Sequence, residues 1–238
     1  MNNSNLEVSG ATLAAIDLFS DLSLDERNDI ALSCRGQQYQ ANELILSHKE
    51  TTNDVFFIVS GTVRVTIYSN LGKEITFRDV LAGQMFGELS AIDGEPRSAH
   101  VIANTVATIV FITPGNFWRL LSTYPVIAQR TLKYLTRLIR LLSDRVIEFS
   151  ALDVKNRIHA ELLRLGKDAQ RNESVVAIVP APTHAEIASR VSTHREAVTR
   201  EMGLLTRQNI IRKEKNTLII QDINTLQKMV SDVLNYEK

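Results

Sequence analysis

The spacing of hydrophobic residues divides the chain into a helical beginning, a strand-rich middle and a mostly helical remainder. Over residues 12–35 the hydrophobic positions follow helical spacing but are interrupted by Asp and Ser turn signals. From Asn42 the period becomes two, in short β-branched segments separated by Gly, Asn, Asp or Pro. This pattern is typical of an antiparallel sandwich, barrel or roll. The predicted strands are residues 43–47, 54–61, 62–69, 73–81, 98–103 and 105–112.

A long segment without Gly or Pro follows Pro125 and continues to Gly166. Its hydrophobic residues step by four, three, four and three, the spacing of a two-stranded coiled-coil seam. The alternative is an amphipathic helix that packs on its own domain, but so long a seam would leave apolar surface exposed on a monomer, which favours a dimerisation helix. The pattern loosens over residues 149–156, where we place an interdomain hinge. The seam residues are Leu135, Ile139, Leu142, Val146 and Phe149.

The C-terminal part has the pattern of a helix-turn-helix followed by a hairpin. A helix is predicted over residues 156–165, then a polar loop, two short helices, and two strands over 208–211 and 217–221 joined by the charged turn RKEKN. This order is a winged helix. The expected fold class is therefore α+β, with an N-terminal antiparallel β-roll, a long dimerisation helix and a C-terminal winged helix-turn-helix. The expected domains are residues 1–115, 116–153 and 154–238.

The bulk composition restricts the location and the chemistry of the chain. Its 238 residues are 44% hydrophobic, enough for one large core or two modest ones. The first ten residues are polar and no apolar run approaches about 18 residues, so a cytoplasmic protein without a membrane partner is expected. Cys34 is the single cysteine, which excludes an intrachain disulfide and a cysteine-built metal site. The five histidines lack ligand spacing, so neither a metal, a haem nor an iron–sulfur cluster is expected.

Charge is distributed unevenly although the net charge is zero. Residues 1–153 hold 13 Lys and Arg against 17 Asp and Glu, a charge of −4, whereas residues 154–238 hold 14 against 10, a charge of +4. The asymmetry indicates that the C-terminal part meets a polyanion.

Residues 86–101, FGELSAIDGEPRSAHV, place complementary groups within a short segment. Gly87 allows a close backbone approach and an exposed N–H at a helix start. Glu88 accepts hydrogen bonds when ionised, which suits a sugar hydroxyl. Arg97 matches two phosphate oxygens with its planar fork, and Ser98 adds a hydroxyl. The segment therefore predicts a site for a small phosphate ester, although Glu88 and Arg97 could instead form an ion pair that braces a loop.

Residues 183–202 have the pattern of two short helices whose second carries a polar reading face. Thr183 and Glu186 form a T-x-x-E capping box for the first helix, and Thr193 is the expected N-cap of the second. Arginines can bind guanine N7 and O6, and the glutamate can accept from a cytosine amino group. A salt-bridged helix surface is the alternative. The packed residues are Ile187, Ala188, Val191, Val198 and Met202, and the exposed face holds Arg195, Glu196, Thr199 and Arg200.

With FGEL and PRSA flanking one pocket, a β-roll, a long helix and a winged helix, the chain resembles the Crp–Fnr superfamily, most closely the cyclic AMP receptor proteins. The resemblance implies that Arg97 pairs with a cyclic phosphate, Glu88 with the ribose 2′-OH, and Ser98 with phosphate or base. It implies a pocket lined by Gly87, Leu89 and Ala99. Where the family reaches the purine with a Thr-Ser pair, this chain has Leu142 and Ser143, so cyclic GMP, or tolerance of both nucleotides, becomes a hypothesis beside cyclic AMP.

The same resemblance extends to DNA recognition. Arg195, Glu196 and Arg200 match the family's reading residues, which implies a TGTGA-like half-site read twice by a two-fold dimer. Phosphate contacts are assigned to residues on the two helices and the wing. These are Thr183, Ser192, His194, Arg212, Lys213 and Lys215.

The predicted function is a homodimeric, cyclic-nucleotide-controlled transcription regulator with duplex DNA as its partner and RNA polymerase as a candidate partner. A constitutive DNA-binding regulator, with a structural pocket or a different ligand, is the alternative and predicts equal DNA affinity with and without nucleotide. An enzyme regulated by cyclic nucleotide is disfavoured, because no catalytic constellation remains in the sequence.

Overall fold

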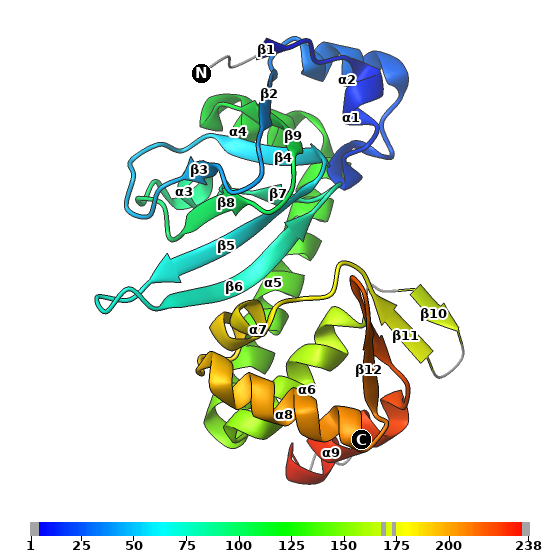
Figure 1. The fold of residues 1–238 in the computed structure, drawn as a ribbon. Helices are drawn as coiled ribbons and strands as arrows, with labels where there is room; N and C mark the ends of the chain where they lie inside the picture. Colours follow the sequence, from blue (N-terminus) through cyan, green and yellow to red (C-terminus); the bar gives the residue numbers. More distant parts are fainter. Residues whose placement is uncertain (1–4, 168–169, 173–174, 235–238) are drawn as a thin grey trace. The chain divides into compact units, whose positions relative to one another are not determined.

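The computed structural model describes residues 5–167, 170–172 and 175–234, in two compact units that comprise Met1–Arg137 and Leu138–Lys238 (Figure 1). The long helix α5 (Pro125–Ala151) begins in the first unit and ends in the second. The boundary between the units therefore lies within α5, inside the predicted dimerisation segment 116–153.

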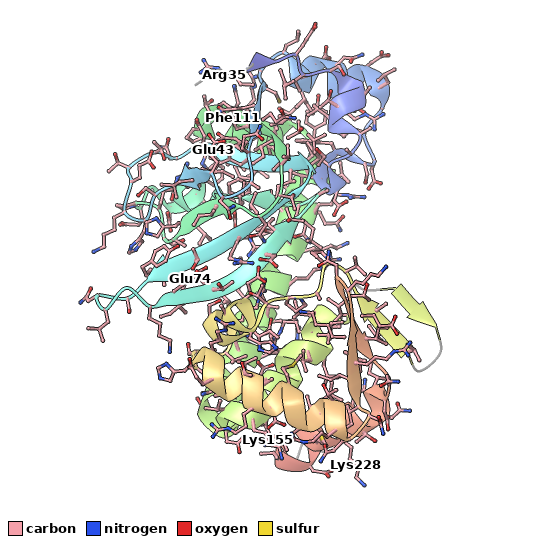
Figure 2. All side chains as sticks on the ribbon, in the orientation of Figure 1. Arg35, Glu43, Glu74, Phe111, Lys155 and Lys228 are labelled. Atoms are coloured by element: carbon pink, nitrogen blue, oxygen red, sulfur yellow. The ribbon has the colours of Figure 1, made fainter. Side chains whose placement is uncertain are left out.

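Two antiparallel sheets form the first unit (Figure 1). Pairing across the first sheet joins distant segments; Arg35 and Phe111, labelled in Figure 2, are cross-strand partners. The first sheet has the order β1 (Asn5–Leu6), β2 (Arg35–Tyr39), β9 (Ala107–Ile112), β4 (Val55–Ser60) and β7 (Met85–Phe86). The second has the order β3 (Leu44–Leu46), β8 (His100–Ala103), β5 (Thr62–Tyr68) and β6 (Glu74–Leu81).

Strand β4 shows why the first unit holds together. Val55 and Phe57 pack into one hydrophobic cluster with Phe19, Phe117 and Ile127. The alternate residues of β4 pack into a second cluster. A strand buried on both faces is hydrophobic at every position, and VFFI satisfies that requirement. The second cluster includes Phe56, Ile58, Val63, Phe86 and Ile109.

The predicted helical segment 12–35 is broken into α1 (Gly10–Leu13), the 3-10 turn Asp17–Phe19 and α2 (Leu24–Ala31). Its last residue already belongs to β2, a strand that the sequence pattern missed because RGQQY has no β-branched residue. Pairing with β1 and β9 holds β2 in the sheet. Two further helices, α3 (Glu88–Asp93) and α4 (Pro114–Thr123), complete the first unit.

Helix α5 carries exposed hydrophobic residues along the predicted seam. Ile139 and Val146 are each 65% exposed, and Leu142 is 42% exposed. The helix ends at Ala151, because the Asp153 side chain accepts from the backbone N–H of Asn156 and starts α6 (Val154–Leu165). The segment from Pro125 to Gly166 therefore contains two helices, and the break between them lies within residues 149–156, where the sequence pattern loosens.

The second unit combines helices with a third antiparallel sheet around its own core (Figure 1). Its helices after α6 are α7 (His184–Arg190), α8 (Arg195–Arg207) and α9 (Ile223–Leu234). Its sheet has the order β10 (Gln170–Asn172), β11 (Val175–Ile178), β13 (Thr217–Ile220) and β12 (Ile211–Glu214). The mixture of antiparallel sheets, a long helix and a C-terminal helix-turn-helix confirms the α+β fold class.

Two details of the predicted wing were wrong. The first wing strand is Ile211–Glu214, so three residues assigned to the charged turn lie in an edge strand. Only Ile211 of this strand is buried, and charged residues on an edge strand resemble a turn in sequence. The hairpin is not terminal either, because α9 follows it and packs Leu226 and Met229 against the core. Within the described residues, no helix combines the length and apolar character needed to cross a bilayer.

Candidate ligand pocket and nucleic-acid interface

Gly87 is the N-cap of α3 and brings the backbone against an arginine. Its φ of 77° lies in the left-handed region that favours glycine. A Cβ at this position would lie 2.9 Å from Nη1 of Arg97 and 3.1 Å from the carbonyl oxygen of Asp54. The glycine predicted for close approach is therefore required both by its conformation and by the space around it.

Arg97 is buried, with 2% of its surface exposed, and its partners are neutral oxygens. Its Nε donates to Oγ1 of Thr52 at 3.1 Å, Nη1 to the carbonyl of Gly87 at 2.8 Å, and Nη2 to the carbonyl of Asp54 at 3.0 Å. The guanidinium also lies over the ring of Phe56. Burial lowers the pKa of Arg97, while the nearby acids, Asp54 first, oppose that shift. A guanidinium has five N–H groups, so two N–H groups of Arg97 remain available to a ligand.

Glu88 is the first residue of α3 and is also only 2% exposed. Burial raises the pKa of its carboxyl group, whereas Arg78 and, to a lesser extent, Arg97 lower it. Among the described residues no ion pair joins Glu88 to Arg97, so the two are held separately instead of neutralising one another. The segment around Gly87 therefore holds one carboxyl group and one cation that are not paired with each other.

Two residues near this pocket were missed by sequence reasoning. Arg78 on β6 donates from Nη2 to the hydroxyl of Tyr134 on α5 at 2.6 Å, and this hydroxyl donates to the carbonyl of Met85 at 2.6 Å. Burial, followed by the charge of Glu88, raises the pKa of Tyr134 to about 12. The two side chains connect the strand before the Gly87 turn to α5. They lie 56 residues apart in sequence, and no local pattern links them.

The other predicted pocket residues have mixed environments. Ala99 is buried, whereas Leu89 and Ser98 are exposed. Leu142 and Ser143 belong to the part of α5 in the second unit, and both are exposed. The hydroxyl of Ser143 donates to the carbonyl of Ile139 within the helix at 3.0 Å.

Helix α7 begins at the predicted capping box. The Thr183 hydroxyl accepts from the backbone N–H of Glu186 at 3.2 Å, and the Glu186 carboxylate accepts from the backbone N–H of Thr183 at 2.7 Å. Helix α8 departs from the prediction, because its N-cap is His194 and no side chain caps it. Thr193 is buried instead, and its N–H donates to the carbonyl of Ala188 at 3.0 Å.

The predicted reading face of α8 is exposed. Arg195, Glu196, Thr199 and Arg200 all face solvent, whereas Val198 and Met202 on the opposite side are buried. A two-helix unit with its second helix presented in this way can enter a major groove with these side chains toward base edges. The predicted phosphate contacts Thr183, His194, Arg212, Lys213 and Lys215 are exposed, and Ser192 is half-buried.

His184, one of the five histidines that lack ligand spacing in the sequence, lies beside the reading face. Its Nδ1 is 2.8 Å from Oγ1 of Thr199. Partial burial lowers the pKa of His184, and the positive charges of Lys213 on β12 and Arg195 on α8 lower it further. Cations from β12 and α8 therefore act on the same ring of α7.

A buried ionic network lies beneath these helices and was also missed. Glu161 of α6 is 1% exposed and accepts from Arg145 of α5 at 2.8 Å. It also forms ion pairs with Arg164 and, at 3.7 Å, with Arg190 of α7. A second buried pair joins Nε2 of His159 to the carboxylate of Glu201 at 2.7 Å. Its partners lie on α6 and α8, so it connects these two helices.

Comparison with known proteins finds a family model for one segment in each of the two units. A model of the cyclic nucleotide-binding domain matches residues 36–124, and a model of the Crp-like helix-turn-helix domain matches residues 156–229. The cAMP-activated global transcriptional regulator CRP of Salmonella typhimurium is 29% identical over 188 residues, which cover 79% of this chain and 90% of that protein.

Solved structures have the same fold. A mutant of CooA from Carboxydothermus hydrogenoformans superimposes with a TM-score of 0.74 at 22% identity, covering 84% of this chain and 89% of that one. The c-di-GMP-responsive global regulator CLP of Xanthomonas campestris superimposes with a TM-score of 0.68 at 18% identity, covering 79% and 94%. At these identities the likeness describes the fold only.

Proposed function

Because the chain belongs to the Crp–Fnr superfamily of DNA-binding transcription regulators, which are not enzymes, we propose that it is a homodimeric regulator whose affinity for DNA is controlled by a cyclic nucleotide. The cyclic nucleotide-binding domain supports a small-molecule effector. The helix-turn-helix domain supports DNA binding, which would take place in the cytoplasm.

The observation that carries the proposal is the environment of Arg97. A buried cation whose hydrogen bonds go only to neutral oxygens is costly until an anion arrives. A cyclic phosphate can accept from the two remaining N–H donors of Arg97, and Glu88 can accept from a ribose hydroxyl. Ser98, Gly87, Leu89 and Ala99 would complete the site.

The effector we favour is cyclic AMP, because relatives at 29% identity are named cAMP-activated regulators. The side chain of Leu142 cannot accept a hydrogen bond from an adenine amino group. Cyclic GMP is therefore the second candidate. Ser143, next to it, offers the hydroxyl that remains.

Coupling between effector and DNA would run through α5. The link from Arg78 to Tyr134 and Met85 joins the pocket strand to this helix. The exposed seam of α5 would pair with a second copy, because so much apolar surface is unfavourable in water. Effector binding would then favour the dimer in which two recognition helices reach successive major grooves, about 34 Å apart.

The DNA target would be a two-fold symmetric, TGTGA-like operator. Arg195 and Arg200 would read guanines, and Glu196 would read a cytosine. RNA polymerase would be a further partner at promoters. The domain limits 1–115, 116–153 and 154–238 remain our proposal for how these tasks are divided.

Operator titration tests the proposal directly. Fluorescence anisotropy of a labelled duplex with two TGTGA half-sites is measured without effector, with cyclic AMP and with cyclic GMP. We expect one nucleotide to raise the affinity by roughly 5- to 150-fold. Equal affinity in all three titrations would favour a constitutive regulator, and no binding under any condition would exclude this operator-binding function.

A further inference from the structure

The hydrogen bonds around Thr199 favour one position for the proton of a neutral His184. A threonine hydroxyl has one proton, and Thr199 donates it to the carbonyl of Arg195 at 3.0 Å. With the Thr199 proton on that carbonyl, the contact of 2.8 Å between Thr199 and His184 is donated by Nδ1–H of the imidazole. In the neutral ring Nε2 is then left as an acceptor with a lone pair.

The charges that act on this ring are cations from two other elements. Lys213 comes from β12 and Arg195 from α8, and both lower the pKa of His184 after the larger effect of burial. The acid nearest along its own helix, Glu186, is bound to the backbone N–H and hydroxyl of Thr183. Free protein therefore favours a neutral His184 whose Nε2 would repel an anionic oxygen.

A DNA phosphate reverses this balance. Its negative charge compensates Arg195 and Lys213, and it offers an acceptor that a protonated Nε2 can bind. We propose that His184 takes up one proton from solvent when the chain binds duplex DNA, and that the resulting Nε2–H donates to a backbone phosphate. This inference rests on the proposed function, and it adds a proton-linked contact at α7 to the exposed cations already assigned.

Calorimetry of operator binding in two buffers of different ionisation enthalpy measures the proton uptake. The duplex carries two TGTGA half-sites, and the nucleotide is held at saturation. We expect proton uptake near neutral pH, together with an affinity gain of about three- to tenfold as the pH falls from about 8 to about 6. His184→Gln, whose amide can still donate to Thr199, should lose both effects. His48→Gln, at a histidine of the first unit outside the DNA-binding helices, should keep them.

The outcomes separate the two proposals. Binding without proton uptake, or with the same uptake in His184→Gln, would overturn the role of His184 and leave the regulator function intact. If the two variants lose the uptake equally, the contact is not specific to His184 and the inference also fails. Absence of operator binding by the unaltered protein at every pH would overturn both proposals.

Discussion

Arg97, which is buried, and Arg145, which is partly buried, have environments of opposite chemistry. In the first unit Arg97 donates only to neutral oxygens, those of Thr52, Gly87 and Asp54. In the second unit Arg145 donates to the carboxylate of Glu161 at 2.8 Å and also contacts the carbonyl of Arg190. Burial lowers the pKa of both arginines, so burial alone does not distinguish them.

The partners make the difference. A carboxylate partner within the chain compensates the cation permanently, which is what a structural network requires. A cation held by carbonyl and hydroxyl oxygens keeps its charge available, so the free energy of its site falls when an anion binds. Mutation of the carboxylate-paired network should therefore lower the free energy of unfolding. Mutation of the arginine held by neutral oxygens should instead lower the affinity for the ligand.

The largest effect is expected for Glu161→Gln. Removing this charge leaves Arg145, Arg164 and Arg190 close together without their shared carboxylate, which should lower the free energy of unfolding of the second unit by about 3–5 kcal/mol. Hydrogen exchange of α6 and α7 measures the free energy of unfolding of this unit. Trp118, the single tryptophan, lies in α4, and its fluorescence reports the unfolding of the first unit separately.

Glu196→Gln is the matched exposed control, for which a change in the free energy of unfolding within about 0.5 kcal/mol is expected. Equal stability of the two variants would contradict a structural network.

Arg97→Gln should lower the affinity for the nucleotide more than it lowers the free energy of unfolding. It removes the charge-assisted contact to the phosphate, worth about 1.5–3 kcal/mol, or roughly 10- to 150-fold in nucleotide affinity. Titration calorimetry with cyclic AMP and cyclic GMP measures this loss. Retained nucleotide affinity in the variant would show that the phosphate binds elsewhere.

Arg195→Ala tests the comparison with an exposed arginine. It should weaken operator binding by about 1–3 kcal/mol and reduce the sequence preference at one base pair, because a bidentate contact to guanine is lost. Since Arg195 faces solvent, the thermal unfolding midpoint should hardly move. Anisotropy titrations with operator and random duplexes measure both affinities. An equal loss for the two duplexes would mean that Arg195 contacts phosphate rather than a base.

Tyr134→Phe should separate nucleotide binding from the effect of the nucleotide on operator affinity. The variant keeps the ring but removes the hydroxyl that accepts from Arg78 and donates to Met85. Nucleotide affinity should stay within about threefold, while the nucleotide's effect on operator affinity should fall by roughly 1 kcal/mol. A parallel loss of both quantities would place Tyr134 in the pocket itself. Unchanged coupling would remove it from the proposed path.

The parts of this protein that could be predicted from sequence are those specified by local spacing. Strands β3 to β6, β8 and β9 of the first unit, the capping box at Thr183 and the exposure of Arg195 all follow from periodicity and short motifs. The contacts of Arg78 and Glu161 could not be predicted, because their partners are distant in sequence and are chosen by tertiary packing. The wing strand was misplaced for a third reason, since its charges serve an exposed sheet edge.

The smallest predicted effect concerns pH, and its sign differs between the units. Burial lowers the pKa of His159, against the opposing influence of Glu201, so the unfolded chain binds a proton more readily than the folded second unit. Its free energy of unfolding should therefore fall as the pH drops below about 6.5, with a slope of at most about 1.4 kcal/mol per pH unit. Glu88 acts in the opposite direction, because its raised pKa lets the folded first unit bind a proton at higher pH than the unfolded chain.

Urea unfolding over a series of pH values measures both slopes. Exchange of α6 and α8 follows the second unit, and Trp118 fluorescence follows the first. His159→Gln should flatten the acid-side loss in the second unit only, because it removes the titrating ring while an amide still reaches Glu201. Glu88→Gln should remove the opposite contribution from the first unit only. If His159→Gln leaves the slope of the second unit unchanged, protonation of His159 is not the source of the acid sensitivity of that unit.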